Sequence, residues 1–160
     1  MASKAPFSSS IVVESVPSAI VGVCRQILFK LEDSSFNKED IFAIHLALEE
    51  ALINAVKHGN KMDPTREVKI DYSISPDKIE ISITDDGVGF NPESVPDPRV
   101  GKNLYRSEGR GLLLMRSYMD SVQFNQQGNC VYMVRYKEKP SITKSRNQTK
   151  NNQTSTSKQD

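Results

Sequence analysis

The amino-acid sequence predicts an α/β (α+β) fold: a two-layer sandwich with helices on one face of a mixed, mostly antiparallel sheet. Two observations predict it. Two long patterns of helical period follow the first strand-like run, and pairs of alternating stretches dominate the second half. The order is strand, helix, helix, strand, strand, irregular loop, helix, strand, strand. Because hairpin partners are antiparallel neighbours, they should share one sheet and leave the helices together on one side.

The first half predicts one strand and two helices. Residues 9–16 contain successive β-branched side chains, as in a strand, and residues 19–31 are apolar at helical spacing. Asn37 is a good N-cap for the second helix, whose pattern runs to about His58, with Gly59 where a C-terminal cap belongs. The apolar positions of this helix are 41, 44, 48, 51, 52, 55 and 56.

The second half predicts two hairpins around a short helix. Residues 91–105 contain three prolines and little periodicity, which indicates an irregular segment with one turn of helix. Residues 111–119 form a short apolar helical pattern. The hairpins pair residues 68–74 with 79–83, and residues 122–126 with 131–136.

The 160 residues are enough for one domain with its own hydrophobic core. We expect a flexible N-terminus over residues 1–8, a folded domain over 9–138 and a disordered tail over 139–160. From residue 141 onward the tail is polar except for Ile142, so it cannot bury enough apolar area to offset its ordering entropy. A binding arm is the alternative for this tail.

Charge and cysteine usage exclude several classes of protein. Of 21 basic and 20 acidic residues, six basic and two acidic ones lie from Lys137 onward, which leaves residues 1–136 with a net charge of −3. Nucleic-acid binding needs clustered basic groups, so no nucleic-acid partner is expected. The absence of a membrane-length apolar run or a secretory signal favours a cytoplasmic protein. Cys24 and Cys130 are expected to be buried reduced thiols.

Three segments carry residues suited to one nucleotide site. Glu50 and Asn54 are four apart on the second helix and project from the same face, in a row that continues to Lys57 and His58. A carboxylate can activate a nucleophile, and an amide oxygen is a hard ligand suited to Mg²⁺. A solvated polar helix face would give the same pattern. Glu49 is five residues from Asn54 and falls off that face.

The second segment combines a strand-ending carboxylate with two glycines. Asp85 precedes Gly87 and Gly89, and glycines allow close approach of the backbone to a ligand. Such a carboxylate can accept a hydrogen bond from an exocyclic amine, as adenine offers. An ordinary strand-ending Asp-Gly turn is the alternative interpretation.

The third segment opens the short helix. Gly109 and Gly111 precede Leu112, so unpaired backbone N–H groups at the helix start can form an anion site. Arg106 and Arg110 flank this segment and could pair with phosphate oxygens. A basic loop without a ligand is the alternative. The chain has no P-loop string, so nucleotide binding would use a different architecture.

In this order the three segments resemble the N, G1 and G2 boxes of the GHKL ATPase superfamily, over about residues 11–136. Residues 54–59 and 111–122 further resemble the bacterial anti-sigma-factor serine kinases. The resemblance implies ATP and Mg²⁺ as cofactors. Glu50 would be the general base, Asn54 the Mg²⁺ ligand and Asp85 the adenine-reading carboxylate.

The same resemblance implies a nucleotide-binding role for further positions. His58 lies at the helix end beside the proposed site, and a helix-capping role is its other interpretation. The lid over residues 91–107 has its own proline-rich sequence, so the choice between the two flanking arginines stays open. The further nucleotide-binding positions are His58, Gly87, Gly89, Arg106, Gly109, Arg110, Gly111 and Leu112.

The implied function is an ATP-dependent protein serine kinase that acts as an anti-sigma factor. It would phosphorylate a STAS-domain antagonist, sequester a sigma factor and form a homodimer, with no nucleic acid or membrane as a partner. One alternative is a nucleotide-gated module of a stress-response partner switch without kinase activity. Another is a stress-signalling member that activates its partner. A histidine kinase is not expected, because His45 sits near the core face and no phospho-accepting region precedes the first strand.

Overall fold

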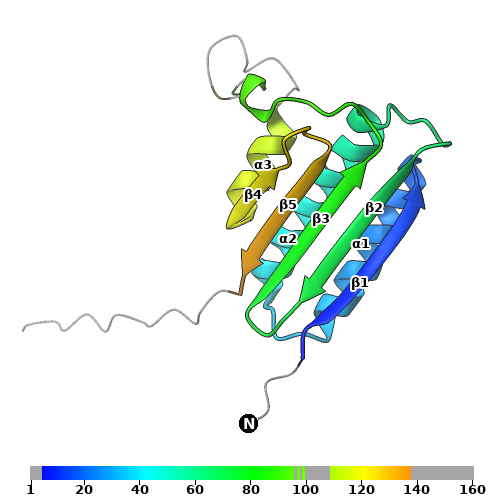
Figure 1. Ribbon diagram of the computed structural model, residues 1–160. Coiled ribbons are helices and arrows are strands. Elements are labelled where there is room, and N and C mark those ends of the chain that lie inside the picture. The colour runs from blue at the N-terminus through cyan, green and yellow to red at the C-terminus, as the bar shows by residue number, and fades with distance from the viewer. Residues whose placement is uncertain (1–4, 96, 98, 100–108, 138–160) are drawn as a thin grey trace, which may run out of the picture.

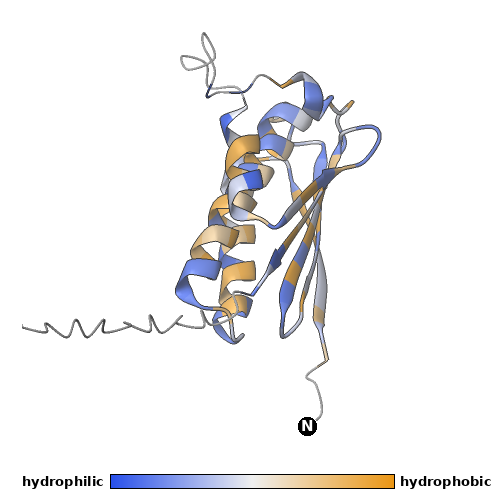
Figure 2. Cartoon of the chain, turned by 90° about the vertical axis from the view of Figure 1, so that its left-hand side faces the viewer, coloured by the Kyte–Doolittle hydropathy of each residue, from blue (hydrophilic) through white to orange (hydrophobic). Residues whose placement is uncertain are grey.

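The structure, a computed structural model, describes residues 5–95, 97, 99 and 109–137. In this part of the chain one sheet has the strand order β1-β2-β3-β5-β4, and every strand pair is antiparallel. Figure 1 shows that the helices lie together on one face of this sheet, and Figure 2 shows the two layers edge-on. The predicted two-layer α/β sandwich is confirmed, and the sheet is antiparallel throughout rather than mixed.

The predicted elements all occur in the predicted order, with ends shifted by a few residues. β1 begins at Phe7, inside the stretch expected to be flexible. The predicted tail over residues 139–160 lies outside the described residues. The bounds are β1 Phe7–Glu14, α1 Pro17–Glu32, α2 Lys38–Ile53, β2 Glu67–Ile74, β3 Lys78–Asp85, α3 Arg110–Tyr118, β4 Ser121–Phe124 and β5 Cys130–Tyr136.

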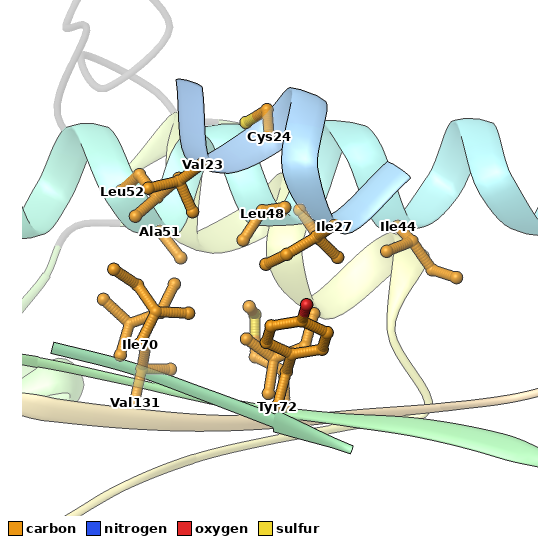
Figure 3. Packing of buried hydrophobic residues seen from close by; sticks show 14 of the residues in the cluster. Val23, Cys24, Ile27, Ile44, Leu48, Ala51, Leu52, Ile70, Tyr72 and Val131 are labelled. Atoms are coloured by element: carbon orange, nitrogen blue, oxygen red, sulfur yellow. The ribbon is translucent and has the colours of Figure 1, made fainter. Parts of the chain in front are cut away.

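The core lies between α1, α2 and the inner face of the sheet. Alternate strand residues point into it, because strand side chains alternate between the two faces. Ile70 and Tyr72 of β2 rise from the sheet toward Ile27 of α1 and Leu48 of α2 in Figure 3. All four side chains are buried, which stabilises the fold through removal of apolar area from water.

The start of α2 agrees with the sequence prediction. The side-chain oxygen of Asn37 accepts a hydrogen bond from the Asp40 N–H at 2.7 Å, as an N-cap residue should. Asp40 itself is fully buried and forms an ion pair with Arg135 of β5, the Oδ1 to Nη2 distance being 2.9 Å. Sequence patterns gave no sign of this pair, because its members lie far apart in the chain.

The end of α2 differs from the prediction. The α-helix ends at Ile53, and a π-helical segment, Asn54–Gly59, continues it. Gly59 was expected at the C-terminal cap, yet the π-helical segment includes it, Asn60 is the cap residue, and the φ of Gly59 is not positive. That prediction was wrong; the reason for a glycine at position 59 lies in the site described below.

Two side-chain predictions also need correction. His45 is half-exposed beside Glu49, at 3.8 Å from Nε2 to the carboxylate, rather than at the core face. Cys24 is buried as expected, and burial, followed by the Glu49 charge, raises its pKa to about 11. Cys130 is only partly buried, and its sulfur accepts a hydrogen bond from Thr84 at 3.2 Å.

No helix in the described ranges is long and apolar enough to cross a membrane.

Candidate functional site

A cavity of about 500 Å³ lies at one end of the sandwich, within the size range of small-molecule sites. The end of β3, the start of α3 and the connection from β4 to β5 meet at the upper end of the molecule in Figure 1. The end of α2 and its π-helical continuation supply another wall. The predicted site residues that line the cavity are Glu50, Asn54, His58, Asp85, Gly89, Gly109, Gly111 and Leu112.

Three of the predicted residues are not among those lining this cavity. Gly87 is buried just behind the wall and donates its N–H to Asp85. Arg110 is exposed at the first position of α3. Arg106 lies outside the described residues. Of the two arginines, Arg110 alone therefore has a described position, and it lies at the rim of the site.

The catalytic candidate Glu50 lies against the start of α3. A Cβ atom placed on Gly111 would be 2.5 Å from Glu50 Oε2 and 3.8 Å from Asn54 Nδ2. A side chain at position 111 would therefore displace the carboxylate. Burial raises the pKa of Glu50, and the adjacent Glu49 carboxylate raises it further.

Asn54 is the first residue of the π-helical segment, and His58 lies near its end. π-helical turns occur mostly as local insertions in α-helices and are frequent at functional sites. Here the segment carries both Asn54 and His58 to the cavity wall, and it sets Gly59 against β3. His58 is exposed, so it reaches the cavity from its rim.

The Asp85 carboxylate is held in a narrow slot between two glycines. A Cβ on Gly59 would lie 2.3 Å from Asp85 Cγ, and a Cβ on Gly87 would lie 2.8 Å from Asp85 Oδ1. The Gly87 N–H donates to Asp85 Oδ1 at 2.8 Å. Burial raises the pKa of Asp85 and this hydrogen bond opposes the rise, so the carboxyl is desolvated but partly satisfied.

The connection between β4 and β5 closes the cavity, which the sequence did not indicate. Gly89 and Gly128 both have left-handed backbones, with φ of +81° and +79°, and each approaches the other segment closely. A Cβ on Gly128 would lie 1.9 Å from the Phe90 carbonyl oxygen. The Phe90 and Phe124 rings pack edge-to-face at 5.1 Å. Sequence periodicity predicted a hairpin between residues 122–126 and 131–136, but it could not show what the turn of this hairpin contacts.

The apolar part of the lining suits a flat aromatic ring. Ile83, Met115, Phe124 and Val131 form walls near Asp85, so a planar base could lie between apolar surfaces with one edge toward the carboxylate. This combination of apolar walls and one desolvated acceptor can select a ring that carries a hydrogen-bond donor.

The opposite end of the cavity suits phosphate. Gly109 precedes α3 with φ of +83° and no side-chain cap hydrogen bond. Because the first backbone N–H groups of a helix have no partner within the helix, a helix start of this kind is suited to an anion. No group of three or more metal-ligating His, Cys, Asp or Glu residues occurs in the described part of the chain. A magnesium ion held at Asn54 would thus take most of its ligands from phosphate oxygens and water, as Mg²⁺ commonly does.

Comparisons with known proteins place this chain in a family. A family described as the histidine kinase-like ATPase domain matches residues 13–135. The serine-protein kinase RsbW of Listeria innocua is 32% identical over 110 residues, which are 64% of this chain and 70% of the relative. RsbW of Oceanobacillus iheyensis is 33% identical over 124 residues, 72% of this chain and 78% of that one.

Two further relatives extend the comparison. The anti-sigma F factor of Clostridium perfringens is 33% identical over 93 residues, covering 57% of this chain and 66% of that protein. The crystal structure of the RsbU and RsbW domains of a Mycobacterium tuberculosis protein aligns with a TM-score of 0.57 at 16% identity. It covers 85% of this chain and 34% of that one, and at this identity it supports the fold alone. The chain belongs to the histidine kinase-like ATPase family, among the relatives of the serine-protein kinase RsbW.

Proposed function

We propose that this chain is an ATP-dependent protein serine kinase that acts as an anti-sigma factor. The observation that carries the proposal is the meeting of three separate segments at one cavity, with Glu50, Asn54 and Asp85 on its wall. The kinase and anti-sigma names of the relatives support the reaction class. The geometry of the cavity supports the role that the proposal gives to each residue.

In the proposed complex, adenine enters between the apolar walls. The Asp85 carboxylate accepts a hydrogen bond from the exocyclic amine, and the slot formed by Gly59 and Gly87 fixes its direction. An unmet buried acceptor is costly, so a base without this donor binds less well. Gly89 lets the loop after β3 pass close to the hairpin that closes the pocket.

The phosphates lie toward the start of α3. Backbone N–H groups after Gly109 and Gly111 face them, where the positive end of the helix favours negative charge. Arg110, and Arg106 outside the described residues, are the cationic candidates beside this position. A Mg²⁺ ion held at Asn54 would supply charge neutralisation for the phosphate oxygens.

Glu50 acts as the general base in this proposal. The serine oxygen of the protein substrate bonds to the γ-phosphorus, the bond to the bridging oxygen breaks, and the hydroxyl proton passes to Glu50. Its raised pKa suits the role, because a base works best when its pKa approaches the working pH. The carboxylate lies beside Gly111, so the start of α3 must leave room for the incoming serine.

The test combines nucleotide binding with phosphoryl transfer. Calorimetry with Mg-ATP and Mg-ADP should show binding by the wild type and a loss of at least about tenfold in affinity for Asp85→Asn. Glu50→Gln should bind nucleotide almost normally but lose about 10²- to 10⁴-fold in phosphoserine formation on a recombinant STAS-domain antagonist. No binding by the wild type would refute the nucleotide site.

The same assay separates the second candidate, a nucleotide-gated binding module without kinase activity. This alternative keeps the nucleotide cavity and its lining residues, and differs from the kinase only in that Glu50 transfers no proton. Nucleotide binding without any phosphoserine would support the gated module and refute the kinase.

The proposed protein partners are a STAS-domain antagonist, a sigma factor and a second copy of this chain. The names of the relatives support the first two. Light scattering would test the homodimer, and co-purification with and without Mg-ATP would test sequestration of a sigma factor. A transcription assay would distinguish inhibition of the partner from its activation.

A further inference from the structure

The peptide group that follows Asp85 is held on both sides by asparagine side chains. Asn129 Nδ2 donates a hydrogen bond to the Asp85 carbonyl oxygen at 3.1 Å. The Asp86 N–H donates to Asn60 Oδ1 at 2.8 Å. The carbonyl and the N–H belong to one planar peptide unit, so both of its polar atoms are fixed by side chains from outside β3.

Asn60 is itself held in place. Its side chain is fully buried at the end of the π-helical segment, and its Nδ2 donates to the Glu67 carbonyl oxygen at 2.9 Å. Its backbone N–H donates to the Ala55 carbonyl oxygen at 2.8 Å. Both ends of the amide are therefore used, which leaves one orientation that satisfies every partner.

Asn129 is fixed by the turn between β4 and β5. Its Oδ1 accepts a hydrogen bond from Asn125 Nδ2 at 2.7 Å. Its backbone carbonyl accepts from the Asp85 N–H at 2.9 Å. Asn129 thus contacts both backbone polar groups of Asp85, one through its side chain and one through its main chain. Asn125 Oδ1 in turn accepts from the Asn129 N–H at 3.0 Å.

The direction of the Asp85 carboxylate depends on this peptide plane. A rotation of the plane would move Gly87, whose N–H donates to Asp85 Oδ1 and whose Cα lies against the Gly59 carbonyl. The slot around the carboxylate would then open. A carboxylate free to turn makes a weaker and less selective hydrogen bond to a ligand.

We propose that Asn60 and Asn129 form an amide clamp that sets the base selectivity of the nucleotide site. The inference rests on the proposed function, in which Asp85 reads the exocyclic amine of adenine. Both asparagines lie outside the three segments that the sequence singled out. Asn60 is fully buried and is not among the residues that line the cavity, whereas Asn129 is one of them. The proposal makes both of them positioning residues, because each acts on the base through its hydrogen bond to the peptide group after Asp85.

A purely structural role for these asparagines leads to a different result. If they only stabilised the turn, replacing them would lower the affinity for every nucleotide by the same factor. If they fix the direction of the Asp85 carboxylate, replacing them would lower the affinity for ATP selectively, because of the two nucleotides compared only ATP carries the exocyclic amine. The comparison nucleotide is therefore purine riboside triphosphate, which lacks the exocyclic amine and keeps the ring, sugar and phosphates.

The experiment measures dissociation constants of both Mg-nucleotides by calorimetry on the full chain. We expect the wild type to favour ATP by about tenfold or more, and Asp85→Asn to abolish the preference. Asn129→Ala should lower the affinity for ATP by about five- to tenfold and change the affinity for purine riboside triphosphate by less than about twofold. Asn60→Ala should act in the same direction, with its urea midpoint reported beside it because this residue is buried.

Ser75→Ala is the matched control. Ser75 belongs to the hairpin between β2 and β3, where its hydroxyl donates to the Lys78 carbonyl oxygen at 3.1 Å. Its position at the opposite end of β3 from Asp85 should leave both nucleotide affinities unchanged. A selective loss in Asn129→Ala and not in Ser75→Ala would support the clamp.

Different results would refute adenine recognition by Asp85 and the amide clamp. A wild type that binds both nucleotides equally, or an Asp85→Asn variant that keeps the preference, would refute adenine reading by Asp85 and the clamp with it. A selective wild type that loses selectivity in Asp85→Asn but keeps it in Asn129→Ala would refute the clamp alone. The clamp alone would also be refuted if Asn129→Ala lowered the affinity for both nucleotides by the same factor and lowered the urea midpoint.

Discussion

At the scale of single residues, neighbouring charges and burial tune the proposed base. Glu50 is partly desolvated against α3, and Glu49 next to it carries a like charge. Both effects disfavour the ionised form, so both raise the pKa of Glu50. A carboxyl whose pKa is raised by folding stabilises the folded state below its unfolded pKa, and this contribution is lost as pH rises through the folded pKa.

We predict that this environment sets the acid limb of the phosphotransfer rate. Protonated Glu50 cannot accept the serine proton, so the rate should fall as pH drops through its raised pKa. Glu49→Gln removes the like charge and should move that limb to lower pH. The measurement is kcat/KM against pH for both proteins, with Glu39→Gln as the control near the start of the same helix. An unmoved limb in Glu49→Gln would contradict the prediction.

At the scale of elements, the sequence predicted the strands and helices better than it predicted how they meet. Apolar periodicity located α1, α2 and both hairpins, because burial against one core imposes that period. Gly59 was assigned to a helix cap, since a glycine after an apolar helix usually has that role. Its actual reason is the Asp85 carboxylate, which belongs to another strand. A contact between distant segments leaves no local pattern.

The same limit applies to the site. Glu50, Asn54 and Asp85 could be predicted as candidates because each lies in a short motif with its own spacing, and all three line one cavity. Asn60 and Asn129 could not, since a buried asparagine at a helix end or in a turn resembles any other polar turn residue. The hydrogen bonds that distinguish them appear only when β3, the end of α2 and the β4–β5 turn are brought together.

The junction between the end of α2 and the end of β3 gives a prediction at this scale. Gly59→Ala should push the Asp85 carboxylate out of its slot, because the added Cβ would lie within 2.3–2.6 Å of its atoms. We expect Mg-ATP affinity by calorimetry to fall by about tenfold or more. Gly22→Ala is the control, because nothing lies within 4 Å of a Cβ placed on this residue in the middle of α1. This variant should keep its Mg-ATP affinity, and its free energy of unfolding in urea should rise by about 0.5–1 kcal/mol. Normal affinity in Gly59→Ala would contradict the slot.

At the scale of the whole molecule, one buried ion pair links the helix layer to the sheet. Asp40 in the first turn of α2 is fully buried, and the side chain of Arg135 on β5 is only 13% exposed. Arg135 Nε and Nη2 donate to Asp40 Oδ1 at 3.1 and 2.9 Å, and Nη1 donates to the Tyr118 carbonyl oxygen at 2.6 Å. The pair therefore joins α2, β5 and the end of α3, whose other end forms the proposed phosphate side of the cavity.

We predict that removing one partner of this buried ion pair lowers the free energy of unfolding much more than removing one partner of an exposed ion pair. Asp40→Ala leaves a buried guanidinium without its carboxylate, which should lower the free energy of unfolding in urea by about 3–5 kcal/mol. Asp71→Ala removes the exposed ion pair with Lys69, 3.4 Å long, and should cost less than about 1 kcal/mol.

A double variant, Asp40→Leu with Arg135→Met, tests whether the cost comes from separating the buried Arg135 guanidinium from the Asp40 carboxylate. Replacing a buried ion pair by apolar residues is often neutral or stabilising, so this variant should recover most of the loss. If the double variant is as unstable as Asp40→Ala, the hydrogen bond from Arg135 to the Tyr118 carbonyl oxygen contributes more to stability than the pairing of the two charges. Nucleotide affinity separates the two outcomes further, because α3 loses the hydrogen bond at Tyr118 in the double variant but not in Asp40→Ala. Loss of nucleotide affinity confined to the double variant would mean that Arg135 stabilises the proposed phosphate-binding start of α3 from the opposite end of that helix.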